Sequence, residues 1–224
     1  MLEKYTGHKA IKGVYQKIIN EIPKHQRYVE LCAGSAKICS LLTVLAKDVI
    51  LNDLDSAVQL FLKEKYRSAT VTNECGISML KKKTAVWYRE TFIFIDPPYL
   101  HSTRTNKNLY NFEMTDVDHK QLLSAVLKMK CNIMIIHPKC ELYDTMLHSW
   151  RKIEVKIRYN RKTSIECLYM NYEEVSELQS DSFLGKDCWD RQRIKRKGDR
   201  LLAKLMGLPV LERNYVLNRL KEIK

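Results

Sequence analysis

Apolar and polar positions along residues 1–172 form short β-rich segments separated by longer helical ones. The four clearest β-rich segments are 28–31, 48–51, 91–95 and 132–136. The two with the longest apolar cores are typical of strands buried on both faces, as in a parallel sheet. Two later segments, 152–159 and 164–171, flank a polar turn and predict a hairpin at the sheet edge.

Helical periodicity occupies the intervals between these strands. One apolar stripe ends at Pro23, and another follows Thr115 and Asp116, which are candidate N-cap residues. The first stripe comprises Ile11, Val14, Tyr15, Ile18 and Ile22, and the second comprises Leu122, Leu123, Val126 and Leu127. The alternation of strands and helices predicts an α/β fold with a doubly wound, mostly parallel, Rossmann-like sheet.

The composition fits a globular domain that binds a polyanion. The chain has 224 residues, of which 45% are hydrophobic and 29% charged, with a formal net charge of +13 and a pI near 9.4. A positive surplus of this size favours nucleic acid as a partner. The competing interpretation is an ordinary soluble protein with a solvated, Lys-rich face.

Charge is concentrated at the end of the chain, which predicts three parts. We expect residues 1–172 to form the main α/β domain, 173–182 an acidic polar linker, and 183–224 a basic helical extension. The extension has twelve Lys and Arg against five Asp and Glu, a net of +7. One helical stripe gathers Arg193, Arg196, Lys197, Arg200 and Lys204. We expect this stripe to contact phosphates, the alternative being a docking helix with a solvated face.

The seven cysteines argue against disulfides and metal. Their number is odd and they form no C-x-x-C pair, so we predict no metal site and buried, free thiols in a reducing cytoplasm. The longest apolar runs are too short to span a bilayer, and residues 1–5 show no apolar signal region. We therefore expect a cytoplasmic protein with no membrane contact.

The most specific motif is Asp96-Pro97-Pro98-Tyr99, directly after the predicted strand 91–95. Ligands of open α/β sheets bind beyond the carboxyl ends of the strands. There, the Asp96 carboxylate and the Pro97 carbonyl can both accept hydrogen bonds from an exocyclic amine. The two prolines stiffen the turn, and Tyr99 offers a face for an extruded base. A plain Pro-rich turn is the alternative.

Two further turns lie after predicted strands. Residues 28–38 run from a strand through the small residues Ala33, Gly34 and Ser35 into a helix, which allows a ligand close to the backbone. After the next strand, Asp53 is placed to accept hydrogen bonds from ribose hydroxyls. Alternatively, Asp53 or Asp55 merely caps the helix that begins at Ser56.

Together these segments resemble the Dam-type DNA N6-adenine methyltransferases, particularly the short phage and prophage forms. Residues 5–9, 100–104, 110–119, 141–150 and 165–171 and the basic tail from 184 to 197 extend the resemblance in the same order. The resemblance implies the S-adenosylmethionine-dependent methyltransferase type of fold. It also implies direct attack by adenine N6 of double-stranded DNA on the methyl group of S-adenosylmethionine.

The resemblance also implies roles for individual residues. The catalytic residues would be Asp96, Pro97, Pro98 and Tyr99. Cofactor contacts would come from Tyr5, Lys9, Glu30, Ala33, Gly34, Ser35, Asp53, Glu74 and Asp96. Lys37 replaces the small residue of that family, so its cation either contacts the cofactor carboxylate or points away. Cys32 replaces a common aromatic residue.

Only 40 residues separate Asp55 from Asp96, so base contacts must come from short segments. The best candidate is the loop 101–111, with Arg104, Asn106 and Lys107, because Arg suits guanine edges and Asn suits adenine edges. The stripe residues Arg193, Arg196, Lys197 and Arg200 would contact phosphates, which position DNA without specifying its sequence. We expect a monomer or a weak dimer.

Three alternatives remain at this point. An RNA adenine-N6 methyltransferase would use the same chemistry, because the tetrapeptide does not read the sugar. A catalytically silent nucleic-acid-binding module would keep the fold without turnover. A basic structural or partner-binding protein would leave Asp96-Pro97-Pro98-Tyr99 unexplained.

Overall fold

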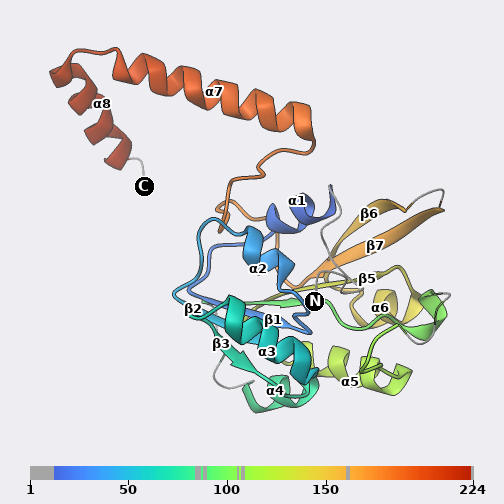
Figure 1. The fold of residues 1–224 in the computed structure, drawn as a ribbon. Coiled ribbons are helices and arrows are strands. Elements are labelled where there is room, and N and C mark those ends of the chain that lie inside the picture. The colour runs from blue at the N-terminus through green and yellow to red at the C-terminus, as the bar shows by residue number, and fades with distance from the viewer. Residues whose placement is uncertain are drawn as a thin grey trace. The chain divides into compact units, whose positions relative to one another are not determined.

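The computed structural model describes residues 13–222, except 84–86, 88–89, 105, 107–108 and 160–161, and the side chains of 158–159 and 162–163 (Figure 1). The chain divides into two compact units, residues 1–182 and 183–224. Each unit is described by itself below.

A seven-stranded sheet forms the centre of the first unit within the described residues. Its strands, in spatial order, are β3 (Thr70–Thr72), β2 (Asp48–Asn52), β1 (Arg27–Leu31), β4 (Thr91–Ile95), β5 (Asn132–Pro138), β7 (Lys162–Met170) and β6 (Arg151–Tyr159). The first five are parallel, while β7 runs antiparallel to both of its neighbours. This confirms the mostly parallel, doubly wound sheet and places the predicted hairpin, β6 and β7, at its edge.

Helices cover both faces of this sheet (Figure 1). They are α1 (Val14–Ile19), α2 (Lys37–Leu41), α3 (Ser56–Lys65), α4 (Gly76–Lys83), α5 (Asp116–Val126) and α6 (Glu141–Met146), with one 3-10 turn, η1 (His101–Thr103). Two predicted caps are confirmed. The Asp55 side chain accepts a hydrogen bond from the Ala57 amide at the start of α3, and Thr115 forms a capping box with Asp118 at α5.

The strand register brings three functional turns to one edge of the sheet. Leu31, at the end of β1, lies beside both Asn52 of β2 and Ile95 of β4. The chain leaves β1 toward β2 on one side, and β4 returns on the other side. The turns after β1, β2 and β4 therefore meet at a topological switch point, where open α/β sheets bind ligands.

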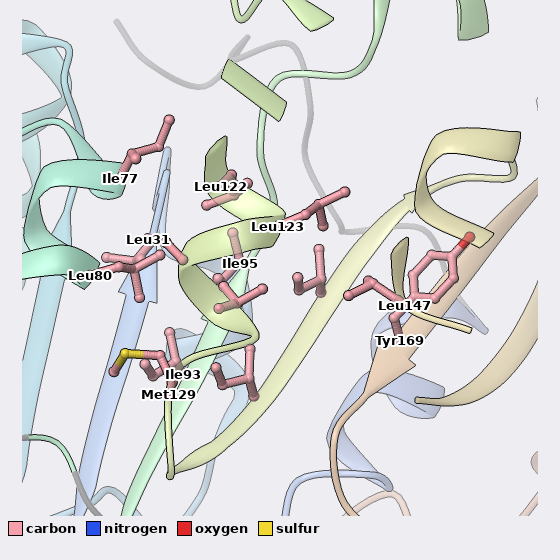
Figure 2. Packing of buried hydrophobic residues seen from close by; sticks show 14 of the residues in the cluster. Leu31, Ile77, Leu80, Ile93, Ile95, Leu122, Leu123, Met129, Leu147 and Tyr169 are labelled. Atoms are coloured by element: carbon pink, nitrogen blue, oxygen red, sulfur yellow. The ribbon is translucent and has the colours of Figure 1, made fainter. Parts of the chain in front are cut away.

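One cluster of core residues lies between the sheet and α4, α5 and α6. Figure 2 shows Leu122 and Leu123 of α5 packed beside Ile95 of β4, with Ile77 and Leu80 of α4 next to them. Alternate residues of the same strands, including Phe92, Phe94, Met134 and Ile136, are also buried, so both faces of the sheet are covered. Burial on both faces explains the continuous apolar runs of β4 and β5.

Some elements differ from the expectation. Helix α1 ends at Ile19, although the apolar stripe continues to Ile22. Ile22 is buried without being helical, and its carbonyl accepts a hydrogen bond from the Gln179 amide. Strand β3 was not predicted, because its three residues are only partly buried or exposed and leave no apolar run. The seven cysteines are free thiols, but Cys75 and Cys188 are exposed.

Residues 173–182, predicted to be a linker, belong to the first unit by their contacts. Gln179 is buried, its side chain accepts from the His25 amide at 3.1 Å, and its amide group donates to the Val44 carbonyl. Glu177 forms an ion pair with Lys24. Polar side chains thus attach this segment to the domain, a role that composition alone does not distinguish from that of a linker.

The second unit consists of two helices, α7 (Cys188–Met206) and α8 (Val210–Glu222). Asp187 caps α7 by accepting a hydrogen bond from the Asp190 amide. Neither helix buries any of its described residues. None of the helices in the described part of the chain has the length and apolarity that crossing a membrane would require.

Candidate functional site

A cavity of about 420 Å³ lies at the carboxyl edge of the sheet, at the switch point. Its walls come from the turns after β1, β2 and β4, the segment 74–77 that leads into α4, and the segment 109–114. Volumes of a few hundred Å³ are typical of sites for small molecules and cofactors. The cavity therefore brings together the turns after β1, β2 and β4, the three segments in which the sequence predicts ligand-binding or catalytic residues.

The turn after β1 forms one wall of the cavity. Ala33, Gly34 and Ser35, the small residues expected to allow a ligand close to the backbone, all line it. Cys32 (φ 55°), Gly34 (φ 53°) and Ala36 (φ 49°) adopt left-handed conformations, which are strained for the two residues that carry a Cβ. Strain of this kind persists only where surrounding contacts hold it, and it concentrates at binding sites.

Asp53, at the end of β2, holds that turn in place. One carboxylate oxygen accepts from the Gly34 amide at 2.8 Å, and the other accepts from the Asp55 amide at 3.0 Å. Burial raises the pKa of Asp53, against the effect of these hydrogen bonds. Asp53 lines the cavity, and its hydrogen bonds also connect the turn after β1 to the turn after β2.

Glu74 lies at the next wall, and Asn52 positions its backbone. The Asn52 amide group donates to the Glu74 carbonyl, while its oxygen accepts from the Glu74 amide. The Glu74 carboxylate forms an ion pair with Lys82 at 2.9 Å. Glu74 therefore lines the cavity with Lys82 of α4 as its partner.

Glu30 is the most deeply buried carboxyl group of the site. Only 3% of it is exposed, and burial raises its pKa from 4.5 to about 8. Its side chain accepts hydrogen bonds from the Tyr28 hydroxyl and the Cys39 amide. Glu30 is thus mostly protonated at neutral pH while it lines the cavity.

The tetrapeptide lies where the sequence predicts, directly after β4. Asp96 and Pro98 line the cavity, whereas Pro97 and Tyr99 lie outside its lining. The Tyr99 ring makes edge contacts with Tyr110 and His137, at centroid distances of 6.5 and 5.4 Å. Burial raises the pKa of the Tyr99 hydroxyl well above its usual value of 10. Tyr99 is therefore held by neighbouring rings instead of projecting freely.

The loop after the tetrapeptide is closed by an ion pair. Arg104 donates to both carboxylate oxygens of Glu113, and only 7% of its side chain is exposed. The guanidinium also lies over the Tyr110 ring, 5.2 Å from its centroid. The Arg104 guanidinium, which was expected to contact a base, is thus bound by Glu113 and Tyr110 of the protein itself.

The remaining predicted nucleic-acid contacts lie in two places. Asn106 is exposed on the loop, and Arg193, Arg196, Lys197 and Arg200 are exposed on α7. Arg193 pairs with Asp190 one turn earlier on that helix. Tyr5, Lys9 and Lys107 lie outside the described residues. No cluster of three or more potential metal ligands occurs in the described part of the chain.

Two buried polar residues contact the tetrapeptide and are not among the predicted site residues. Glu166 of β7 accepts a hydrogen bond from the Tyr99 hydroxyl at 2.5 Å. His137 of β5 accepts one from the Leu100 amide at 3.1 Å. The available signal was a polar residue within each otherwise apolar strand segment, 133–137 and 165–170.

Part of the chain is similar to a known protein family. Residues 62–165 match the model of the D12 class N6 adenine-specific DNA methyltransferases, and this match includes the tetrapeptide. No curated protein sequence matches the chain.

Several solved structures resemble the fold. A conserved hypothetical protein of Streptococcus pyogenes aligns over 75% of this chain and 99% of its own, with a TM-score of 0.50 and 13% identity. M. capricolum TrmK, in complex with S-adenosyl-homocysteine, aligns over 93% of this chain and 94% of its own, with a TM-score of 0.47 and 11% identity. A SAM-dependent methyltransferase of Agrobacterium tumefaciens aligns over 70% of this chain, with a TM-score of 0.46 and 10% identity. The chain covers only 58% of the length of that protein.

These likenesses concern the fold alone, whereas the family match covers the segment that carries the tetrapeptide. The chain therefore has a mostly parallel, Rossmann-like sheet, and its residues 62–165 are similar to the D12 class N6 adenine-specific DNA methyltransferases.

Proposed function

We propose that the protein transfers a methyl group from S-adenosylmethionine to the N6 amino group of adenine in DNA, at a short specific sequence. The observation that carries the proposal is the position of Asp96 and Pro98 in the wall of the cavity at the switch point. A carboxylate placed there can hold an exocyclic amine next to a ligand bound in the same cavity.

The charges around the cavity fit this cofactor. Seven carboxyl side chains line it, and among its described lining residues Lys37 is the one cation. S-adenosylmethionine has two cationic groups, a sulfonium and an ammonium, and one carboxylate. Carboxyl groups such as Asp53 and Asp96 suit the cations, and Lys37 suits the carboxylate. When bound, S-adenosylmethionine supplies the methyl group.

Each turn would hold a different part of the cofactor. The backbone of Ala33, Gly34 and Ser35 lies in the wall near Lys37 and would accommodate the amino-acid end. Asp53 has lone pairs left for ribose hydroxyls, although both of its oxygens already accept backbone hydrogen bonds. Glu74 would lie at the adenine end.

The tetrapeptide would activate the acceptor base. The Asp96 carboxylate and the Pro97 carbonyl would accept the two N–H groups of adenine N6, which draws its lone pair away from the ring. Neither Pro97 nor Pro98 has an amide hydrogen, so the turn offers no competing donor. Two aligned acceptors also stabilise the positive charge that develops on the nitrogen.

DNA would be held mainly by charge. The net charge of +13 and the exposed cations Arg196, Lys197 and Arg200 of α7 support binding of the phosphate backbone. Asn106, exposed on the loop after the tetrapeptide, is a candidate for contact with a base edge.

The proposal is tested by sequencing that detects N6-methyladenine in DNA from cells expressing the chain. We expect methylated adenines in one short motif. Asp96→Ala should abolish them while the dissociation constant for S-adenosylmethionine changes by about fivefold or less. Asp181→Ala, at an exposed aspartate outside the cavity lining, is the matched control and should methylate normally.

Parallel assays on duplex DNA, single-stranded DNA and structured RNA identify the polymer. The proposal is wrong if the purified protein binds S-adenosylmethionine but methylates none of the DNA substrates. Transfer to RNA alone would reassign the substrate.

A further inference from the structure

Strand β5, next to β4 in the sheet, continues past the point where β4 ends. Ile95, the last residue of β4, pairs with Ile135 of β5, and β5 continues to Pro138. In the antiparallel β5–β7 ladder, His137 lies opposite Cys167, and Pro138 lies opposite Glu166. This register places His137 and Glu166 beside the chain as it leaves β4, although they are 37 and 67 residues from their partners Leu100 and Tyr99.

His137 accepts a backbone hydrogen bond at the end of the tetrapeptide. The Leu100 amide donates to His137 Nε2 at 3.1 Å, and the imidazole is completely buried. Its other nitrogen, Nδ1, lies 2.8 Å from the Pro138 carbonyl oxygen, which can only accept. Nδ1 therefore bears the proton and Nε2 the lone pair, so the hydrogen bonds select one neutral tautomer.

Two rings hold this imidazole in orientation. Tyr143 of α6 stacks on it at a centroid distance of 4.0 Å and an interplanar angle of 7°. The Tyr143 hydroxyl in turn lies 2.8 Å from Nδ1 of His119 on α5, and both residues are fully buried. Tyr143 of α6 and, through it, His119 of α5 thus support the His137 imidazole that accepts the Leu100 hydrogen bond.

Glu166 holds the side chain of Tyr99. The Tyr99 hydroxyl donates to Glu166 Oε1 at 2.5 Å, and Glu166 is 8% exposed. The edge of the Tyr99 ring also packs on His137. The two anchors therefore act on adjacent residues, one on a side chain and the other on the backbone.

We propose that His137 and Glu166 are positioning residues that hold Tyr99 and the Leu100 backbone in place for methyl transfer, without touching base or cofactor. The proposal rests on the proposed function. Neither residue lines the cavity, so their loss should disturb the acceptor side of the reaction and leave cofactor binding intact. Small displacements of positioned groups reduce catalytic rates strongly.

The test for His137 compares two substitutions. His137→Leu removes the acceptor, whereas His137→Gln keeps a carbonyl oxygen at a similar distance from the backbone. We expect His137→Leu to lower kcat about 10- to 100-fold, with the dissociation constant for S-adenosylmethionine within about twofold of wild type. His137→Gln should recover most of kcat.

Amide hydrogen exchange gives a readout that does not depend on activity. In His137→Leu the Leu100 amide should exchange about tenfold faster or more, because its acceptor is gone, while the Ile93 and Ile95 amides stay protected. Unchanged exchange at Leu100, or equal loss of protection throughout β4, would overturn the role of His137.

Glu166 is tested by a double-mutant cycle with Tyr99. If Glu166 acts through the Tyr99 hydroxyl, Glu166→Ala should lower kcat in wild type but have little further effect in Tyr99→Phe. Glu166→Gln keeps an acceptor and should be the milder change. Glu154→Gln, at an exposed glutamate on the neighbouring strand β6, is the control.

The results separate this proposal from the proposed function. If the wild-type protein methylates no DNA, the proposed function fails. If wild type is active and both His137→Leu and Glu166→Ala keep the wild-type kcat, the positioning proposal alone is wrong. Independent effects of Glu166→Ala and Tyr99→Phe would also overturn the role of Glu166.

Discussion

Arg104 and Glu113, nine residues apart in the chain, form a two-point ion pair beside the cavity. The same carboxylate accepts hydrogen bonds from the amides of Leu109 and Tyr110. Four donors therefore converge on one side chain and close the loop that follows the tetrapeptide. Because residues 109–114 line the cavity, this carboxylate shapes one of its walls.

Glu113→Gln should destabilise the fold by about 2 kcal/mol, because it leaves the nearly buried Arg104 cation without its counter-charge. Urea denaturation measures the change. Glu177→Gln is the matched control. It removes the charge from the exposed Lys24–Glu177 pair and should cost about 0.5 kcal/mol or less. Equal effects of the two variants would contradict a structural role for the Arg104 pair.

The Arg104–Glu113 pair should also make the free energy of unfolding depend on pH in the acid range. The Arg104 hydrogen bonds lower the pKa of Glu113 from 4.5 to about 2. A lowered carboxyl pKa gives stability that is present above pH 4.5 and is lost as the pH falls toward 2. We expect the free energy of unfolding of wild type to decline through this window more steeply than that of Glu113→Gln. Parallel curves would show that the pair does not contribute to acid sensitivity.

Cofactor binding should release a proton from Glu30. Its pKa of about 8 means that the side chain is protonated at pH 7 in the free protein, and a nearby cationic ligand favours the carboxylate. Affinity for S-adenosylmethionine should therefore rise as the pH increases toward 8. Calorimetry at pH 7 in buffers of different ionisation enthalpy should detect release of roughly one proton, and Glu30→Gln should abolish it.

Glu30 also affects stability in the free protein. Between about pH 4.5 and 8 the folded state retains a proton that the unfolded state has lost, so stability falls as the pH rises through this window. Glu30→Gln should weaken this decline. Proton release that is the same in wild type and Glu30→Gln would assign the titration to another group.

Lys37→Met should weaken binding of S-adenosylmethionine about tenfold, equivalent to about 1.4 kcal/mol, because it removes the one cation among the described lining residues. Methylthioadenosine lacks the amino-acid carboxylate, so its affinity should change little. Equilibrium binding of both ligands makes the comparison. If both lose affinity equally, Lys37 affects the cavity as a whole and not the carboxylate.

Arg196→Glu combined with Lys197→Glu should weaken binding to all DNA sequences alike and flatten the salt dependence of affinity, because phosphate contacts release counterions. The pair Lys128→Glu and Lys130→Glu, at exposed positions of the first unit, makes the same change in net charge and is the control. Unchanged affinity and salt slope in the α7 variant would exclude a phosphate role for this stripe.

The parts of the fold that could be predicted are those with local signals. Strand β4 has the predicted bounds, 91–95, because an unbroken apolar run followed by two prolines leaves little choice of boundary. Asp55 was identified as a cap because the side chain acts within two residues of its own position. The cavity turns could be placed because parallel strands end at one edge of the sheet.

The parts that could not be predicted depend on distant partners. Nothing near Arg104 shows that its guanidinium is bound by Glu113, since that contact depends on the path of the whole loop. His137 and Glu166 contact the tetrapeptide only because β5 and β7 extend past β4 in an antiparallel register. Strand β3 lacks an apolar run and is recognised only by its pairing with β2.

In the proposed reaction, different strands of the sheet would support the methyl donor and the acceptor. Residues following β1 and β2 build the walls around the candidate methyl donor, while β5 and β7 supply the anchors behind Tyr99 and Leu100. Substitutions on the β5–β7 side should therefore alter how firmly Tyr99 and Leu100 are held, and leave the affinity for the donor unaltered.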